Sequence, residues 1–339
     1  MNIGITYDLR DQYLKLGFSE EETAEFDKKS TIDAIDNTLK ELGHTTERIG
    51  NIWDLTRKLN KGKTWDLVFN IAEGLRGIGR EAQVPAILDA YNIPYTFSDP
   101  LVLALTLHKG MTKRVLRDLK IPTPDFFEVH KIEDVKKVKL KYPLFAKPNA
   151  EGTGKGITGK SIIKNKKELY EVCEYLLTTF KQPVLVEEFL PGREFTTGIV
   201  GTGEKAKVIG SMEVILLKDA EPDVYSYANK DDWIGKIEYK LVNDPIVKKA
   251  EKFALEAWKG LGCRDAGRID IRVDKYGVPN IIELNPLAGI HPTHSDLPII
   301  CTLKNIEYKT LFNWIIESAS ERIVEQKQKL EKVVSEIVS

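Results

Sequence analysis

Residues 264–285, with the sequence RDAGRIDIRVDKYGVPNIIELN, form the most informative segment of this chain. The motif RIDIRV alternates charged and apolar residues, which predicts a strand that presents Arg268 and Asp270 on one face. The motif DKYG predicts a tight turn, and NIIELN then predicts a returning strand with Glu283 and Asn285 on one face. The sequence therefore predicts a β-hairpin that gathers carboxylates, an amide and an arginine.

The oxygen side chains of this hairpin suit a divalent cation. Mg²⁺ is usually held by one or two carboxylates together with substrate phosphates, and Mn²⁺ accepts the same kinds of ligand. We expect Asp270, Glu283 and Asn285 to be the metal ligands. Arg268 would then face negative charge that the metal leaves uncompensated. A surface hairpin with ordinary cross-strand ion pairs is the alternative.

Length and composition indicate a globular protein of two or three domains. The chain has 339 residues, of which 42% are hydrophobic and 30% are charged. Its 50 basic and 51 acidic residues give a net charge of -1. No global field would attract nucleic acid or an anionic membrane, so we expect neither as a partner.

Cysteine spacing and the amino terminus favour a cytoplasmic protein. Cys173, Cys263 and Cys301 are far apart and form no CxxC motif, which argues against a disulfide framework and a structural zinc site. The first ten residues lack the layout of a secretory signal. No apolar run approaches the roughly 20 residues needed to span a bilayer.

The first hundred residues alternate strand and helix patterns, which predicts a small parallel sheet with helices on its faces. Such sheets bind ligands at the carboxyl ends of their strands. Asp8 and Arg10 follow the expected strand NIGITY, and Asn70 and Glu73 lie at the end of another. We expect these side chains to contact a ligand, with loop capping and surface pairing as the alternative.

Periodicity and turn signals predict the remaining elements. The expected helices cover 30–42, 53–60, 80–91, 102–119, 166–180 and 306–339, and the expected strands outside the hairpin cover 2–7, 44–50, 66–74, 144–148, 157–164, 184–190 and 194–201. The last two strands, which Pro191 and Gly192 separate, fit a second hairpin. The C-terminal helix could pack on the body of the protein or on a partner helix.

The segment 154–161, GKGITGKS, matches the phosphate-loop pattern GxxxxGK[ST]. A true loop of this kind leads directly into a helix. Here Ser161 leads into β-branched residues of an expected strand, and the next helix waits for a capping Asn165. We therefore reject a P-loop phosphotransferase as the main reading. We still expect the free amides and Lys155 of this glycine-rich loop to cover phosphates.

Five segments, taken in order, resemble the ATP-grasp superfamily and, more narrowly, the D-alanine:D-alanine ligases. They are NIAEGLRGIGREAQVPAILDAYNIPYTFSDP (70–100), FAKPNAEGTGKGI (145–157), VLVEEFLPGREFTTGIVG (184–201), YSYANK (225–230) and GRIDIRVDKYGVPNIIELNPLAGIHPTHS (267–295). The resemblance spans about residues 66–315. The combined order is far more specific than any single motif.

The resemblance implies a fold that is α/β and α+β, in which ATP lies between two lobes. We expect a pre-ATP-grasp domain over 1–100, a central lobe over 101–183 and a C-terminal lobe with the metal hairpin over 184–320. A helical tail over 321–339 would follow. A homodimer is also implied by the similarity to the family.

Matching positions imply roles for individual residues. The phosphates would contact Lys109, Lys147 and Lys230, the adenine would lie at Glu187, Glu188, Phe189 and Leu190, and the ribose would lie at Glu194. Thr153 would lie in the loop over the phosphates, Arg268 and Gly289 would surround the acyl intermediate, and His294 and Ser295 would lie near the acceptor. Asp270, Glu283 and Asn285 match the metal ligands of the family.

The implied chemistry joins a carboxylate to an amine at the expense of ATP. The carboxylate attacks the γ-phosphate to form an acyl phosphate, which the amine then attacks. Arg268 and an amide near Gly289 would stabilise the resulting oxyanion. The expected substrates are small amino acids or acyl compounds.

Two departures from the ligase pattern lie on the substrate side. The amino terminus lacks the family's glycine-rich stretch with serine and glutamate, and Asp231 replaces a tyrosine that usually follows the lysine of YxYxxK. Asp8 could instead anchor an ammonium group, and Arg10 could clamp a carboxylate. These departures leave the donor open.

Three functions therefore compete. D-alanine dimerisation is the leading single activity, and a ligase of a specialised pathway with another donor is the second. The third is a nucleotide-binding protein without catalysis. Against the third stands the complete set of Lys147, Arg268, Asp270, Glu283 and Asn285, since a pure binder needs no oxyanion arginine.

Overall fold

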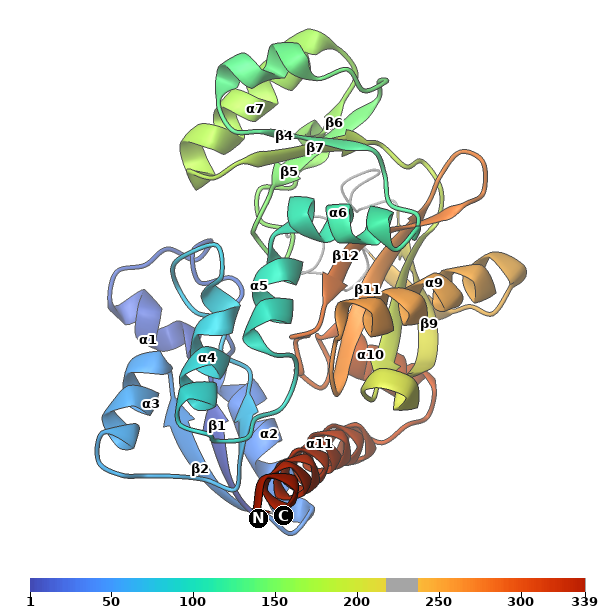
Figure 1. The fold of residues 1–339 in the computed structure, drawn as a ribbon. Coiled ribbons are helices and arrows are strands. Elements are labelled where there is room, and N and C mark those ends of the chain that lie inside the picture. The colour runs from blue at the N-terminus through green and yellow to red at the C-terminus, as the bar shows by residue number, and fades with distance from the viewer. Residues whose placement is uncertain (218–236, 339) are drawn as a thin grey trace.

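A computed structural model describes residues 1–217 and 237–338 of the chain, without the side chains of 326, 327 and 329–338. The described strands form three sheets with the orders β2-β1-β3, β4-β7-β5-β6 and β10-β9-β8-β11-β12. The sheets lie in separate parts of the molecule, with the helices α5 and α6 between them (Figure 1). In the described ranges, no helix is long and apolar enough to cross a membrane.

The N-terminal sheet is parallel, as the sequence predicts. Its strands are β1 (Asn2–Thr6), β2 (Thr45–Gly50) and β3 (Leu67–Asn70), and its helices are α1 (Arg10–Lys15), α2 (Lys29–Glu41), α3 (Ile52–Leu59) and α4 (Gln83–Ala90). All four residues of β3 are buried, which explains its apolar run over residues 67–69. Asn51 begins α3 by accepting hydrogen bonds from two amides of the first turn.

The expected helix over 102–119 is two helices, α5 (Pro100–Leu107) and α6 (Lys109–Asp118). The break lies at His108, whose ψ of 88° is not helical. Its imidazole compensates by accepting a hydrogen bond from the Met111 amide at 3.2 Å, and so caps α6. Apolar periodicity continues across the break, which is why the sequence predicts a single helix.

The four-stranded sheet contains β4 (Phe126–Val129), β5 (Leu144–Pro148), β6 (Ile162–Ile163) and β7 (Val184–Glu188). One helix, α7 (Lys166–Phe180), packs on it, and Asn165 caps this helix as predicted. The expected strand over 157–164 is wrong in extent, because 159–161 form a 3-10 turn and only two residues are extended. Since a strand lies between the turn and α7, the rejection of a P-loop is confirmed.

The five-stranded sheet contains β8 (Glu194–Val200), β9 (Lys207–Leu216), β10 (Ile237–Leu241), β11 (Ala266–Val273) and β12 (Pro279–Asn285). Its helices are α9 (Pro245–Leu261), α10 (Asp296–Leu303) and α11 (Tyr308–Val338). The expected hairpin of 184–190 with 194–201 is wrong, because β7 pairs with β4 and β5 whereas β8 pairs with β9 and β11. The turn at Pro191 and Gly192 therefore joins two sheets.

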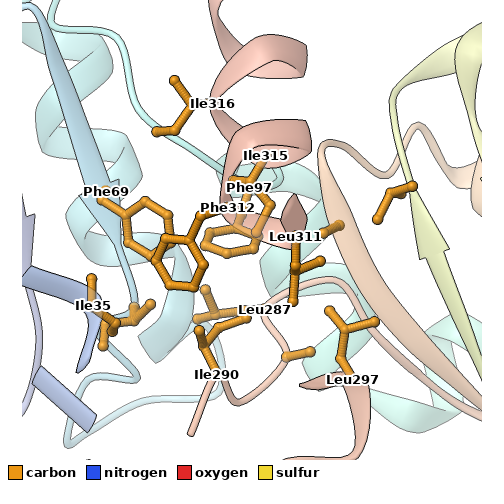
Figure 2. Packing of buried hydrophobic residues seen from close by; sticks show 14 of the residues in the cluster. Ile35, Phe69, Phe97, Leu287, Ile290, Leu297, Leu311, Phe312, Ile315 and Ile316 are labelled. Carbon is orange, nitrogen blue, oxygen red and sulfur yellow. The ribbon is translucent and has the colours of Figure 1, made fainter. Parts of the chain in front are cut away.

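Helix α11 packs between the N-terminal sheet and the C-terminal lobe. Figure 2 shows Phe312 of α11 beside Phe69 of β3, and these rings are stacked with centroids 5.1 Å apart. The same core contains Ile3 of β1 and Ile300 of α10. The helix runs through residue 321 without interruption, so the predicted tail boundary falls inside it.

Candidate active site

The predicted hairpin is present as β11 and β12. Arg268 pairs with Asn285, and Asp270 pairs with Glu283. Residues paired directly across two antiparallel strands share a face, so the structure brings these four side chains together as expected. An irregularity in the register follows Asp270, and it leaves Ile282 without a partner on β11.

Hydrogen bonds connect the side chains of this face. The Arg268 guanidinium pairs with Asp270 and, at 3.3 Å, with Asp296. Asp270 also accepts hydrogen bonds from the Thr196 hydroxyl at 2.9 Å and from the Asn285 amide at 3.2 Å. Burial by itself would lower the pKa of Arg268, but the surrounding carboxylates raise it above its ordinary value. The guanidinium is therefore charged throughout the physiological range.

One cavity at this face lies between the four-stranded and five-stranded sheets and contains the predicted nucleotide residues. Lys147, Thr153, Glu187, Glu188, Phe189, Leu190, Glu194, Arg268, Asp270 and Glu283 line it. Glu188 ends β7 and Glu194 begins β8, so the connection between the two sheets forms a wall of the cavity. The Arg272 guanidinium lies over the Phe189 ring at 5.0 Å and pairs with Glu194 at 3.2 Å.

Lysines lie deep in this region. Lys147 pairs with Glu187 at 3.1 Å, and Lys113 of α6 pairs with the other oxygen of Glu187 at 2.8 Å. Burial lowers the pKa of Lys113 to about 8 despite this partner. Lys109 contacts the Glu151 carbonyl oxygen and Glu283, the latter at 3.3 Å. The sequence reasoning missed Lys113, although its spacing of four residues from Lys109 places both on one helix face.

A second cavity, of about 260 Å³, lies between the N-terminal domain and the C-terminal lobe. The predicted substrate residues Arg10, Glu73, His294 and Ser295 line it together with Gly289. The Ser295 hydroxyl accepts a hydrogen bond from the His291 amide at 2.9 Å. A Cβ at Gly289 would lie 2.8 Å from that hydroxyl, so the close approach of these two segments requires glycine.

The two cavities meet at three residues. Thr153, Arg268 and Glu283 line both of them. Thr153, between Gly152 and Gly154, has a φ of +55°, an uncommon conformation for a β-branched residue. Ligands bound in the two cavities would therefore meet next to the Thr153 hydroxyl, the Arg268 guanidinium and the Glu283 carboxylate.

The second cavity also contains Asp27 and Glu81, two acids that the sequence reasoning missed, beside the predicted Glu73. Burial raises the pKa of Asp27 to about 7 and that of Glu81 to about 8, and burial and neighbouring carboxylates raise the pKa of Glu73 well above its usual value. Within 1–217 and 237–338, no ion pair joins any of these three carboxylates to a basic side chain. A positively charged group bound beside these carboxylates would therefore favour their ionised forms.

Two predicted residues lie elsewhere. Asp8 does not line the second cavity, because its carboxylate accepts hydrogen bonds from the Tyr13 hydroxyl and, at 2.9 Å, from the Gly74 amide. Burial raises its pKa. Lys155 lines a third cavity, where it pairs with Glu151 at 3.2 Å. Lys230 and Asp231 lie outside the described residues.

Comparisons with known proteins agree with this architecture. A family model described as D-ala D-ala ligase C-terminus matches residues 115–317. The D-alanine–D-alanine ligase of Aquifex aeolicus is 33% identical over 287 residues, which cover 84% of this chain and 92% of that relative. The uncharacterized protein y4sG of Sinorhizobium fredii is 28% identical, covering 86% of this chain and 87% of its own length.

Solved structures share the fold. The D-alanine–D-alanine ligase of Bacillus anthracis complexed with ATP has a TM-score of 0.72 at 22% identity, covering 96% of this chain and 99% of that one. The VanG D-Ala:D-Ser ligase of Enterococcus faecalis has a TM-score of 0.70 at 18% identity, covering 94% and 99%. This chain thus belongs to the D-alanine–D-alanine ligase family of the ATP-grasp superfamily, whose members are ATP-dependent ligases that form C–N bonds.

Proposed function

We propose that this ligase activates the carboxylate of one amino acid with ATP and joins it to the amine of a second amino acid, and that D-alanine is the first substrate to test. The meeting of the two cavities at Thr153, Arg268 and Glu283 carries this proposal. ATP would occupy the cavity between the two sheets, with its γ-phosphate at the junction. The amino acids would occupy the cavity beside the N-terminal domain.

In the first step, a carboxylate oxygen of the donor attacks the γ-phosphorus. The bond between that phosphorus and the oxygen bridging to the β-phosphate breaks, and ADP leaves with the electron pair. Lys109 and Lys147 are buried next to the cavity and would offset the repulsion between the two anions. Thr153 would position the transferred group from the loop above it.

In the second step, the acceptor amine attacks the carbonyl carbon of the acyl phosphate. The amine loses a proton, and collapse of the tetrahedral species expels inorganic phosphate and leaves an amide. Arg268 is held by Asp270 and Asp296, so its guanidinium needs no reorganisation to stabilise the developing oxyanion. The Gly289 amide is the second candidate donor.

The hairpin residues fit a divalent cation. Asp270 and Glu283 are directly opposite in the register, and Asn285 donates through its amide nitrogen, which leaves the amide oxygen available as a ligand. Asp270, Glu283 and Asn285 would hold Mg²⁺ or Mn²⁺. When bound, the cation would supply positive charge that neutralises the phosphates.

The acids of the second cavity support a donor with an ammonium group. Asp27, Glu73 and Glu81 line the cavity, and a positively charged group would favour their ionised forms. Arg10 pairs with Glu20 at the same wall and could receive the carboxylate of a substrate. These contacts favour a free amino acid over an N-acylated one.

The experiment is a substrate screen with purified protein, ATP and Mg²⁺. D-alanine alone should release phosphate and yield a dipeptide that mass spectrometry identifies, with L-alanine and N-acetyl-D-alanine as controls. Phosphate release without an amide product, whatever amino acid is supplied, would contradict the proposal. An amide made only from other amino acids would favour a specialised ligase, which the unpredicted acids Asp27 and Glu81 of the cavity also support.

We also propose that the enzyme works in the cytoplasm, where ATP is supplied and its three buried cysteines stay reduced. The predicted homodimer awaits a measurement of molar mass by light scattering.

A further inference from the structure

We propose that Glu25 is a positioning residue that holds the glycine loop, defined as residues 150–156, closed over the junction of the two cavities. The glycine loop leads from β5 toward the 3-10 turn, whereas Glu25 belongs to the N-terminal domain, in the segment before α2. Closing the junction would keep water away from the acyl phosphate. The inference rests on the proposed function for its chemistry, and on contacts in the described residues for its geometry.

The contacts of Glu25 converge on the glycine loop. Its carboxylate accepts a hydrogen bond from the Gly152 amide. Arg80 donates to the same carboxylate at 2.7 Å and, through its other nitrogen, to the Ala150 carbonyl oxygen at 2.8 Å. Lys155 of the loop lies 3.4 Å from the Glu25 carboxylate. Two residues of the N-terminal domain therefore bind three positions of the loop.

These charged groups are shielded from solvent. The side chains of Glu25, Arg80 and Lys155 are 6%, 7% and 8% exposed. Burial by itself would raise the pKa of Glu25, but the positive charges of Arg80 and Lys155 have the larger effect. The pKa of Glu25 is therefore below its usual value, and the carboxylate is ionised. Buried ion pairs contribute little net stability, because desolvation offsets their attraction, but they fix one geometry. The cluster thus suits a fixed docking contact rather than general stabilisation.

Packing at Gly152 indicates how tightly the loop is seated. A Cβ at this position would lie 2.6 Å from an oxygen of Glu25. A methyl group at Gly152 and the Glu25 carboxylate cannot both keep these positions, so an alanine here would disturb the hydrogen bond between the Gly152 amide and Glu25.

The glycine loop connects this docking contact to the chemistry. Thr153 follows Gly152 directly and lines both cavities, while Glu25 and Gly152 themselves line the second cavity. Displacement of the loop would move Thr153 and open the junction. Water could then attack the acyl phosphate, releasing phosphate and regenerating the carboxylic acid, so that ATP is consumed without an amide.

The test measures how much ADP is released for each amide formed, together with kcat and the KM for ATP. Wild type should release about one ADP per amide, and Glu25→Ala should raise this ratio roughly threefold or more because water enters. Glu25→Gln retains an acceptor for the Gly152 amide and should have a smaller effect. Glu22→Gln alters an exposed acid of the same segment and should leave the ratio unchanged.

A second variant protects the test against a folding defect. Gly152→Ala leaves Glu25 and Arg80 intact but places a methyl group against the carboxylate, and it should raise the ratio as Glu25→Ala does. A ratio that stays at the wild-type value in both variants, with amide still formed, overturns the inference and leaves the proposed function standing.

Hydrogen exchange separates the two proposals. In full-length protein with a non-hydrolysable ATP analogue, Glu25→Ala should accelerate exchange of the amides in 150–156 more than in the neighbouring strand β5. If wild type forms no amide from any amino acid but this acceleration occurs, the proposed function fails and the docking role of Glu25 stands. Unchanged exchange in the loop would overturn the docking role.

Discussion

Arg268 lies where the cavities proposed for nucleotide and substrate meet, and its position is fixed from two sides. Asp270, on the same strand, and Asp296, at the start of α10, both pair with its guanidinium. Complete removal of this cation would take a positive charge from between two buried carboxylates, which is destabilising. A test of its chemical role therefore needs a substitution that keeps the charge.

Arg268→Lys should impair catalysis more than binding. The ammonium keeps a positive charge but cannot contact both carboxylates and the oxyanion with fixed geometry. Loss of one such donor costs about 100- to 1,000-fold in kcat, so we expect a fall in that range with a KM for ATP close to the wild-type value. Steady-state kinetics of amide formation measures this, and circular dichroism verifies folding. A kcat within tenfold of wild type would remove Arg268 from the oxyanion role.

The raised pKa of Glu81 predicts how the stability of the protein depends on pH. Burial raises its pKa to about 8 in the folded protein, so the folded state holds this proton more tightly than the unfolded state does. The bound proton therefore stabilises the folded protein. This stabilisation is complete below the pKa that Glu81 has in the unfolded chain, and it is lost as the pH rises through the pKa that Glu81 has in the folded protein. Stability of the ligand-free protein should therefore fall between about pH 4.5 and pH 8.

Glu81→Gln should weaken this dependence, because glutamine has no proton to lose. Its Tm should exceed that of wild type by a few degrees at pH 8.5, and the difference should shrink as the pH falls toward 5. Differential scanning calorimetry at several pH values measures the difference. A Tm difference that is constant across this range would show that Glu81 titrates normally.

At the scale of elements, helix α11 attaches the N-terminal sheet to the C-terminal lobe. Arg322 of this helix pairs with Asp265, which is fully buried, and also donates to the Tyr95 carbonyl oxygen at 3.1 Å. Asp265 in turn accepts a hydrogen bond from the Phe97 amide at 2.7 Å. The ion pair therefore joins three segments that are distant in sequence.

Arg322→Leu should destabilise the protein strongly, since it leaves the Asp265 carboxylate buried without its cation. Breaking a buried pair in this way costs roughly 3 to 5 kcal/mol. Lys205→Leu is the matched control, because Lys205 forms an exposed pair with Glu321 of the same helix and should change stability by less than about 1 kcal/mol. Urea denaturation gives both values, and equal effects would contradict the structural role of Arg322.

At the scale of the whole molecule, nucleotide should stabilise the two lobes together, because the cavity proposed for it is lined by residues of both the four-stranded and the five-stranded sheet. A ligand at a hundredfold excess over its Kd adds about 2.7 kcal/mol to the free energy of unfolding. A non-hydrolysable ATP analogue with Mg²⁺ should therefore raise the Tm, and a chelator should reduce this rise.

Asp270→Asn should make the nucleotide-induced rise in Tm insensitive to Mg²⁺, because it removes a proposed metal ligand. Asp274→Asn changes the turn of the same hairpin, outside both cavities, and should leave the Mg²⁺ dependence intact. Thermal shift measurements with and without chelator compare the two variants. A Mg²⁺ effect of wild-type size in Asp270→Asn would remove the hairpin as the metal site.

Much of the site was predictable because its parts are local in sequence. The face shared by Arg268 and Asp270 follows from the two-residue period of a strand, and the start of α7 follows from Asn165. Continuous apolar strands alternating with helices predict the parallel N-terminal sheet. By contrast, the turn at Pro191 and Gly192 has the residues of a hairpin turn, but sequence does not state which strands will pair across it.

By itself, the sequence determined which side chains share a face of the hairpin, most of the pattern of elements and the family resemblance, because each depends on the spacing of residues along the chain. Tertiary structure alone decided that Glu25 meets Gly152, 127 positions away, and that Lys113 shares Glu187 with Lys147. It also excluded Asp8 from the cavity and brought Asp27 and Glu81 to its wall. Such contacts depend on how separately formed sheets pack against one another, and no local period of the chain records that packing.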